Sequence, residues 1–342
     1  MIFLYFGLIA LFATGCKLRN VAVASTWLNR DTTTAINGFF ILIVLVNHAN
    51  QYISGTGFTY TSWMDASYRH VASYVGQLIV AMFLFNSGFG VMESIKHKKD
   101  EYVRNMPKRR ILPVLANFDI AVLVFCVLNL LLGISMNVRQ FLLSLVCWDD
   151  VGNSNWYIFA ILYCYVAVYV AFRLAKSRDR GLMFALSGIL AYALVMPFFK
   201  GGYWYDTIFA FATGLVVSNY KERIHAFANK HYWSCFAALC VCFIIGKIVV
   251  GHLPLRRLDH NCITVVFCLM FALICMKVDF GNHMTAWCGK NLFPLYIYQR
   301  IPMVALAATT SLAAKAPIVF VILSGLLTLP LVVAYKHFKI SP

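Results

Sequence analysis

The chain has 342 residues, of which 61% are hydrophobic and only 12% are charged, and its formal net charge is +16. Soluble globular domains carry about twice this share of charged residues, so the composition excludes an ordinary soluble protein. Apolar runs recur from end to end, which predicts an all-α, polytopic membrane helix bundle without a separate soluble domain. Most basic residues lie in short links between these runs, so we do not expect the charge to serve nucleic-acid binding.

The apolar runs predict about eleven membrane segments. Their approximate bounds are 2–15, 35–53, 70–94, 111–134, 155–175, 181–199, 203–219, 233–250, 261–278, 291–310 and 317–336. A further apolar piece, 139–147, is too short to cross and is expected to lie in the interface or to re-enter. Residues 2–15 fit either a cleaved signal peptide or a retained first helix. The missing basic n-region and cleavage site favour the retained helix.

The basic residues predict the orientation of the bundle. The links after predicted segments 1, 3, 5, 7 and 9, with the C-terminal end, hold 21 of the 29 Lys and Arg. Cytoplasmic loops are enriched in these residues, so we expect an outside N-terminus and a cytoplasmic C-terminus. The densest group has seven cations within residues 96–110. It fits either attraction to anionic membrane lipids or a phosphate clamp for a cytosolic cofactor, formed by Lys108, Arg109 and Arg110 where the next helix starts.

The most informative stretch is 36–52, an apolar helix that holds His48 next to Asn47 and close to Asn50. An ionisable side chain inside a membrane helix is costly, which makes a functional site the default interpretation. Asn37 lies eleven residues before His48, about three helical turns away and on nearly the same face. The alternative interpretation is a histidine that is only packed and hydrogen-bonded in the core.

Two other predicted segments carry polar residues within apolar sequence. Asp119 lies about two turns into segment 111–134, as a functional acid or as a structural partner of Arg300. Gln299 and Arg300 lie near the middle of segment 291–310, between Pro294 and Pro302. Because the prolines free local backbone groups, this segment predicts either a polar cavity or a buried ion pair.

The predicted outer links are rich in aromatic and acidic residues, which suit either an interface belt or contact with a sugar. The candidates for contact with an acceptor are Trp148, Asp149, Trp156 and Asp206. The eleven cysteines are scattered mainly through apolar segments and form no paired C-x-x-C motif. We therefore expect neither a metal site nor a disulfide framework.

Three motifs, in this order, resemble the integral-membrane acyltransferase 3 family. They are L-V-N-H at 45–48; F-L-F-N-S-G-F-G-V at 83–91, which contains Ser87 and is followed by P-K-R-R-I-L-P at 107–113; and G-K-N-L-F-P-L-Y-I-Y at 289–298. N-S-N-W-Y-I-F at 153–159 is similar to a helix start of that family. The resemblance covers about residues 30–340. It predicts an acyltransferase-like domain at 30–342, preceded at 1–29 by an extra transmembrane helix and a cytoplasmic link.

The resemblance implies transfer of an acyl group, usually acetyl from acetyl-CoA, to a hydroxyl of a carbohydrate or cell-envelope glycan, with His48 as the essential histidine. The chain departs from the family at three places. Asn37 stands where Arg or Lys is usual, and Gln299 stands where histidine is common. Pro107 occupies the first position of an R-x-x-R pair whose second position is Arg110. Lys108 or Arg109 would then have to substitute for the first arginine.

These observations predict a site with three parts. Lys108, Arg109, Arg110, Ser87 and Asn37 are the candidates for binding acyl-CoA. His48 is the candidate general base or covalent acyl carrier. The candidates for stabilising the oxyanion or lining the cavity are Asn47, Asn50, Asp119, Gln299 and Arg300.

Two functions from other classes remain open. One is a transporter or flippase of a glycan or lipid intermediate, with Asp119, His48 and Arg300 along a polar path, although no inverted repeat is visible. The other is a structural membrane subunit. We expect a multi-pass protein of a cell membrane, taken as the bacterial inner membrane. The sequence indicates neither the acceptor nor the oligomeric state.

Overall fold

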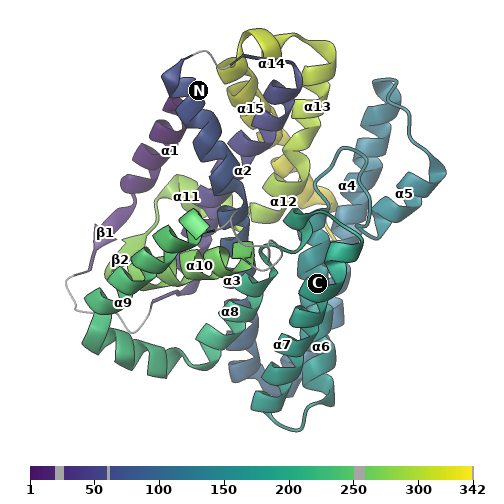
Figure 1. Cartoon of the computed structure of the whole chain (residues 1–342). Coiled ribbons are helices and arrows are strands. Elements are labelled where there is room, and N and C mark those ends of the chain that lie inside the picture. Colours follow the sequence, from purple (N-terminus) through teal and green to yellow (C-terminus); the bar gives the residue numbers. More distant parts are fainter. Residues whose placement is uncertain (20–26, 60–61, 250–258, 341–342) are drawn as a thin grey trace.

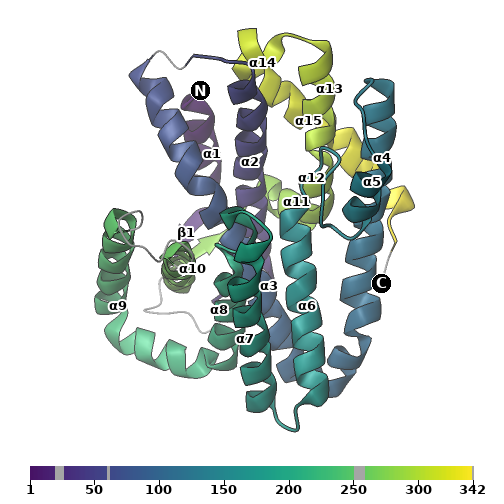
Figure 2. The same ribbon diagram turned by 45° about the vertical axis from the view of Figure 1, so that its right-hand side comes forward.

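The structure is a computed structural model, and it describes residues 1–19, 27–59, 62–249 and 259–340. Within these ranges the chain is almost entirely helical, with one two-stranded sheet (Figure 1). In Figures 1 and 2, α9 (Lys221–Val249) and α10 (Asp259–Lys277) lie on one side of the bundle, and α4 (Leu112–Leu131) and α5 (Val138–Leu145) lie on the other. The prediction of an all-α membrane helix bundle is confirmed.

The remaining elements follow the predicted segments closely. The other long helices are α2 (Arg30–Gly55), α3 (Trp63–Met106), α6 (Trp156–Leu174), α7 (Arg178–Val195) and α15 (Pro317–Phe338). The shorter helices are α1 (Phe3–Ala13), α8 (Ile208–Asn219), α11 (His283–Lys290), α12 (Leu292–Tyr298), α13 (Arg300–Thr309) and α14 (Leu312–Lys315). The π-helical turn η1 (Pro107–Ile111) joins α3 to α4, and two 3-10 turns, η2 (Met196–Phe198) and η3 (Gly202–Trp204), precede α8.

Seven helical stretches of the described chain are long and apolar enough to cross a membrane. One of them, Trp63–Leu131, contains two predicted segments because α3 continues through η1 into α4, with a bend at Lys99, whose φ is 46°. Segments 203–219 and 291–310 become shorter or broken helices. At 1.5 Å per residue, the 11 residues of α1 span about 16 Å, which is too short for a hydrocarbon core of about 30 Å. The sequence predicted about eleven membrane segments, and seven helical stretches of the described chain meet the length and hydropathy of a full span.

The C-terminal end of α1 and the strand after it attach this helix to the bundle. Strand β1 (Cys16–Leu18) pairs antiparallel with β2 (Val278–Phe280), which directly follows α10. The Phe12 ring stacks on Phe39 of α2 at 4.1 Å and on Phe280 at 5.0 Å between ring centroids. Asn282 donates its side-chain amide to the Leu11 carbonyl at 2.8 Å. These contacts fix the position of α1 along α2.

Two pairs of helices cross at glycine contacts. A Cβ at Gly38 of α2 would lie 1.8 Å from the Thr285 carbonyl oxygen of α11, and one at Gly289 of α11 would lie 1.9 Å from the Thr34 oxygen. Without a hydrophobic drive between helices in lipid, such small-residue contacts let backbones approach and pack.

The second crossing joins α3 to α8. A Cβ at Gly88 would lie 2.2 Å from the Phe211 oxygen, and one at Gly214 would lie 2.2 Å from the Phe85 oxygen. Gly90, two residues further along α3, has no neighbouring atom within 4 Å of the added Cβ and makes no such contact.

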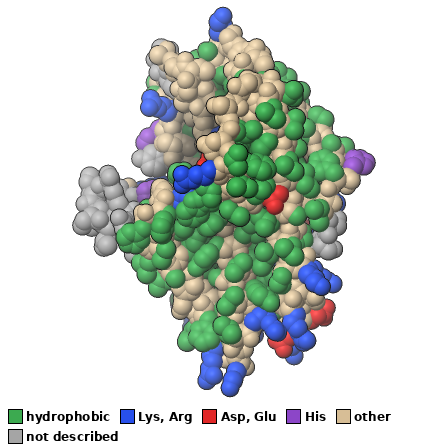
Figure 3. Space-filling model, turned by 90° about the vertical axis from the view of Figure 1, so that its right-hand side faces the viewer, with side chains coloured by type: hydrophobic (Ala, Val, Ile, Leu, Met, Phe, Trp, Pro, Cys, Tyr) green, Lys and Arg blue, Asp and Glu red, His purple; other side chains and the backbone are tan. Residues whose placement is uncertain are grey.

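One face of the bundle has the surface expected in lipid. In Figure 3, hydrophobic side chains cover the middle of the molecule and Lys and Arg gather at the bottom. Helix α4 contributes exposed Leu123, Val127, Leu130 and Leu131. This distribution agrees with an apolar belt that ends at a basic surface.

The glycine crossing of α2 and α11 yields a stability prediction. Gly38→Ala is expected to destabilise the fold by about 1–3 kcal/mol, because the new methyl group overlaps the Thr285 carbonyl and the two backbones must separate. The measurement is the melting temperature of the purified protein in detergent. Gly90→Ala is the matched control, since its methyl group meets open space, and it should melt at or slightly above the wild-type temperature. Equal melting of both variants would contradict the packing argument.

Candidate active site

Two polar cavities open at opposite ends of α2. The first, of about 540 Å³, is called the basic cavity and contains Thr33 and Asn37 from the first turns of the helix. The second, of about 580 Å³, is called the His48 cavity and reaches Ser54 in the last turn. Together they contain most of the residues that the sequence singled out.

The basic cavity is lined by four cations from three separate parts of the chain. These are Arg109 and Arg110 of η1, Lys290 at the end of α11, and Lys339 after α15. All four are exposed, so the cavity is open at this end. The residues that line this cavity all lie in the described part of the chain, and none of them is acidic. The charge of this lining is therefore complementary to an anion.

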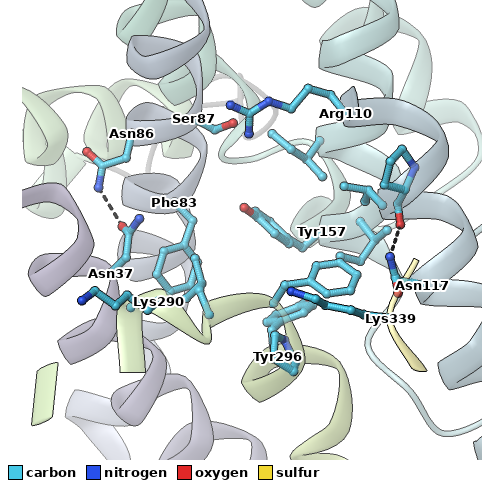
Figure 4. Close-up of a pocket in the computed structure, with 18 of the residues that line it drawn as sticks. Asn37, Phe83, Asn86, Ser87, Arg110, Asn117, Tyr157, Lys290, Tyr296 and Lys339 are labelled. Atoms are coloured by element: carbon cyan, nitrogen blue, oxygen red, sulfur yellow. Dashed lines mark hydrogen bonds between the residues drawn. The ribbon is translucent and has the colours of Figure 1, made fainter. Parts of the chain in front are cut away.

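Hydrogen bonds hold the polar wall of this cavity. Asn86 of α3 donates its side-chain amide to the Asn37 side-chain oxygen at 2.7 Å, and the Ser87 and Tyr165 hydroxyls lie 2.8 Å apart. In Figure 4, Arg110 extends across the cavity toward Ser87, and Lys339 enters beside the Tyr157 and Tyr296 rings.

The segment that carries Lys339 is fixed by a pair of hydrogen bonds to α4. Asn117 donates to the Ile340 carbonyl at 2.8 Å and accepts from the Ile340 N–H at 2.9 Å. Because Ile340 directly follows Lys339, the two bonds keep this part of the chain at the wall of the basic cavity.

The His48 cavity combines one imidazole with two arginines, Arg69 and Arg300, and the carboxylate of Asp150. His48 is buried, at 9% exposure. Arg300, at the start of α13, donates its Nε to the Tyr52 hydroxyl and one Nη to the Ser154 hydroxyl, each at 3.2 Å. No ion pair within the described residues includes Arg300. Its full positive charge and its three remaining N–H groups are thus available to a ligand.

Three aromatic side chains lie between the two cavities and are called the aromatic layer: Phe83, Tyr157 and Tyr296. The Phe83 and Tyr157 ring centroids are 6.1 Å apart, and those of Tyr157 and Tyr296 are 5.2 Å apart. All three line the basic cavity. The Tyr296 ring also lies 6.2 Å from the His48 ring on the other side. Tyr296 therefore lies between the basic cavity and His48.

The helix α1 also contributes to the His48 cavity. The Tyr5 hydroxyl donates a hydrogen bond to the Asn47 side-chain oxygen, and Tyr5 is only 5% exposed. The Tyr5 ring packs on Tyr68 of α3 at 5.4 Å between centroids. The Asn47 amide nitrogen is buried without a hydrogen-bond partner among the described residues and lies beside Gly76. Tyr5 thus fixes the orientation of the amide directly next to His48.

The structure brings together many of the predicted site residues. In the basic cavity it places Asn37, Ser87, Arg109 and Arg110. In the His48 cavity it places Asn47, His48, Asn50, Trp156 and Arg300. Lys108 is exposed and lines neither cavity, whereas Arg109 lines the basic cavity.

The two remaining predicted polar residues of the membrane segments lie outside both cavities. Asp119 is half-buried on α4, and no ion pair with Arg300 is formed. Gln299 is buried between α12 and α13, and it donates to the Tyr296 carbonyl at 3.2 Å. That bond holds the amide nitrogen of Gln299 where the two helices break, and its side-chain oxygen is buried without a hydrogen-bond partner among the described residues.

Three predicted acceptor contacts also lie outside the cavities. Trp148 packs against Trp204, with the Lys200 ammonium 4.4 Å from its ring centre. Asp149 accepts from the Asp150 backbone N–H at 2.9 Å, and it is Asp150 that lines the His48 cavity. Asp206 precedes α8 and lines neither cavity.

Sequence reasoning missed several lining residues. The most important are Asn86, Tyr157, Lys290, Tyr296 and Lys339 in the basic cavity and Tyr52, Asn153, Ser154 and Asn155 in or beside the His48 cavity. Most lie within or next to the quoted motifs, which was the available signal. Within the described residues, no group of three or more His, Cys, Asp or Glu could hold a metal ion.

The comparison with protein families decides the class of the protein. The family model described as an acyltransferase domain, that of acyltransferase 3, matches residues 34–337. The chain belongs to this family. It is therefore a membrane acyltransferase. The matched range starts within α2, so α1 and β1 lie outside it. No curated protein and no solved structure matched the chain.

The hydrogen bond from α1 yields a prediction about activity. Tyr5→Phe removes the hydroxyl that orients Asn47 and keeps the packed ring, so we expect acyl transfer to slow about tenfold with a nearly unchanged melting temperature. Steady-state kinetics of the purified acyltransferase measures this. Tyr232→Phe is the control, because it also removes an interhelical hydroxyl, bonded to the Leu273 carbonyl at 3.1 Å, away from both cavities. Equal rates for the two variants would contradict the role of Tyr5.

Proposed function

We propose that this acyltransferase moves an acyl group, in the first place acetyl, from acyl-CoA to a hydroxyl of a carbohydrate or cell-envelope glycan. The observation that carries the proposal is the pair of cavities on the two sides of the aromatic layer. One is basic and open, and the other holds His48 and many neutral polar groups. A donor and an acceptor of different chemistry can thus approach the aromatic layer from opposite ends.

The basic cavity fits the phosphate end of CoA. Arg109, Arg110, Lys290 and Lys339 supply positive charge without a lining carboxylate, and arginine binds phosphate oxygens through two parallel hydrogen bonds. All four cations belong to links that the basic-residue bias assigns to the cytoplasmic side, where acyl-CoA is found.

The His48 cavity fits a polyhydroxylated acceptor. Its lining includes the side chains of Asn50, Gln51, Gln77 and Asn153, with the aromatic rings of Trp156 and Tyr203. Amide groups exchange hydrogen bonds with hydroxyls in both directions, and aromatic rings cover the apolar face of a sugar. A polar cavity with aromatic side chains is therefore suited to a glycan.

The chemistry follows from the position of His48. As a neutral imidazole, His48 accepts the proton of the acceptor hydroxyl. At the same time, the oxygen of that hydroxyl forms a C–O bond to the acyl carbon of the donor. The C–S bond then breaks, and the proton held by His48 is returned to the departing sulfur. Arg300 and the Asn47 amide face the same cavity and can stabilise the negative charge on the acyl oxygen.

The first test of this function is His48→Ala in the purified protein, assayed with acetyl-CoA and membrane glycan. Loss of the general base is expected to lower kcat about 10²- to 10⁴-fold. CoA binding should be unchanged, because His48 lines the other cavity. His231→Ala on exposed α9 is the matched control. Full turnover by His48→Ala would contradict the assignment of His48 as the general base. Glycan flux without acyl transfer would indicate a transporter instead.

The second test separates the charge of Arg300 from its shape. Arg300→Gln is expected to lower kcat about 10²-fold, because the charge opposite the developing oxyanion is lost. Arg300→Lys keeps the charge but loses the two positioned bonds to Tyr52 and Ser154, so an intermediate rate is expected. Initial rates at saturating donor and acceptor measure both variants. A pure rise in KM with unchanged kcat would show that Arg300 only binds substrate.

A further inference from the structure

The basic cavity contains a pair of neutral amides below its charged mouth. Asn86 is 8% exposed and holds the side-chain oxygen of Asn37 at 2.7 Å. The amide nitrogen of Asn37 is left on the side of Phe83, toward the cavity, as Figure 4 shows. No hydrogen bond of this nitrogen to another described residue is formed. The pair therefore presents a positioned N–H donor without charge.

The position of this donor differs from that of the cations. Arg109, Arg110, Lys290 and Lys339 are exposed, whereas Asn37 is half-buried. Along α2, Asn37 lies about 16 Å from His48 at 1.5 Å per residue. A ligand that runs from the exposed mouth of the cavity to the aromatic layer thus passes Asn37, which lines the same cavity as the cations.

A neutral donor selects a different group from the one that a cation selects. Lysine and arginine neutralise phosphate or carboxylate, whereas a carboxamide N–H adds no charge and can pair with a neutral carbonyl oxygen without leaving an unpaired ion at that position. The arm of CoA has two amide groups between its diphosphate and its sulfur. Their carbonyl oxygens are the acceptors that match this position.

We propose that Asn37, held in place by Asn86, binds the carbonyl oxygen of an amide in the arm of the acyl-CoA donor. The inference rests on the proposed function, since it takes acyl-CoA as the donor. It divides the basic cavity into an outer part for phosphates and an inner part for the arm. Asn86 acts as a positioning residue, because its own bond is made to Asn37.

The test measures binding, so that it does not depend on turnover. Titration calorimetry on the full-length protein in detergent compares CoA with pantetheine, which keeps both amides but lacks the phosphates and the nucleoside. Asn37→Ala is expected to weaken the binding of both compounds by the same factor, about two- to tenfold. Arg110→Gln is expected to weaken CoA binding and to leave pantetheine binding unchanged, since Arg110 serves the phosphates.

Two further variants separate positioning from general damage. Asn86→Ala should weaken both compounds by less than Asn37→Ala does, and should cause no additional loss in the Asn37→Ala background, because it acts only through Asn37. Asn261→Ala is the matched control. It also removes a buried amide that bonds two backbone groups, the Tyr205 carbonyl at 2.8 Å and the Phe209 N–H at 3.1 Å, but it lies outside the cavities. It should leave both affinities unchanged.

The outcomes that overturn the inference are distinct. If the wild-type protein binds CoA, and Asn37→Ala binds both CoA and pantetheine as tightly as the wild-type protein does, the inference alone is wrong. If Asn37→Ala weakens CoA but not pantetheine, Asn37 contacts a phosphate and the inference is again wrong. If the wild-type protein binds neither compound, the proposed donor is wrong, and the inference falls with it.

Discussion

The site depends on the close contact of helix backbones that carry glycine at the crossing. Gly38 and Gly289 bring α2 against α11, and Gly88 and Gly214 bring α3 against α8. Each crossing has a cavity residue directly beside its glycine: Asn37 precedes Gly38, Lys290 follows Gly289 and Ser87 precedes Gly88. Since side chains one residue away from a contact lie at its edge, the geometry that packs these helices also sets the walls of the basic cavity.

The sequence predicted the class of fold well, because long apolar runs identify membrane helices even when the contacts between the helices are unknown. It predicted lengths poorly where helices break. The predicted segment 291–310 breaks at Gln299, whose side chain bonds the Tyr296 carbonyl. Periodicity places a residue on a face of its own helix, but it does not say which other helix that face meets.

The same limit explains which site residues were predicted. His48, Arg300 and Arg110 are unusual within or beside apolar sequence, so their chemistry alone drew attention to them. Asp119 and Asp206 are equally unusual and lie outside both cavities. Conversely, Asn86, Tyr157 and Tyr296 are ordinary residues of membrane helices. They matter because α3, α6 and α12 meet at the basic cavity, which becomes visible only when the helices are assembled.

The aromatic layer has a consequence for the membrane as a barrier. A continuous polar channel through the bundle would let ions and protons leak across the membrane and would dissipate the ion gradient. Phe83, Tyr157 and Tyr296 instead line the basic cavity with packed rings, and Tyr296 stands between this cavity and His48. On the proposed function, only a group as small as an acyl chain needs to pass these rings, while the costly carrier stays in the cytosol. The enzyme would then transfer acyl groups to the other side of the membrane without transporting CoA and without letting ions leak.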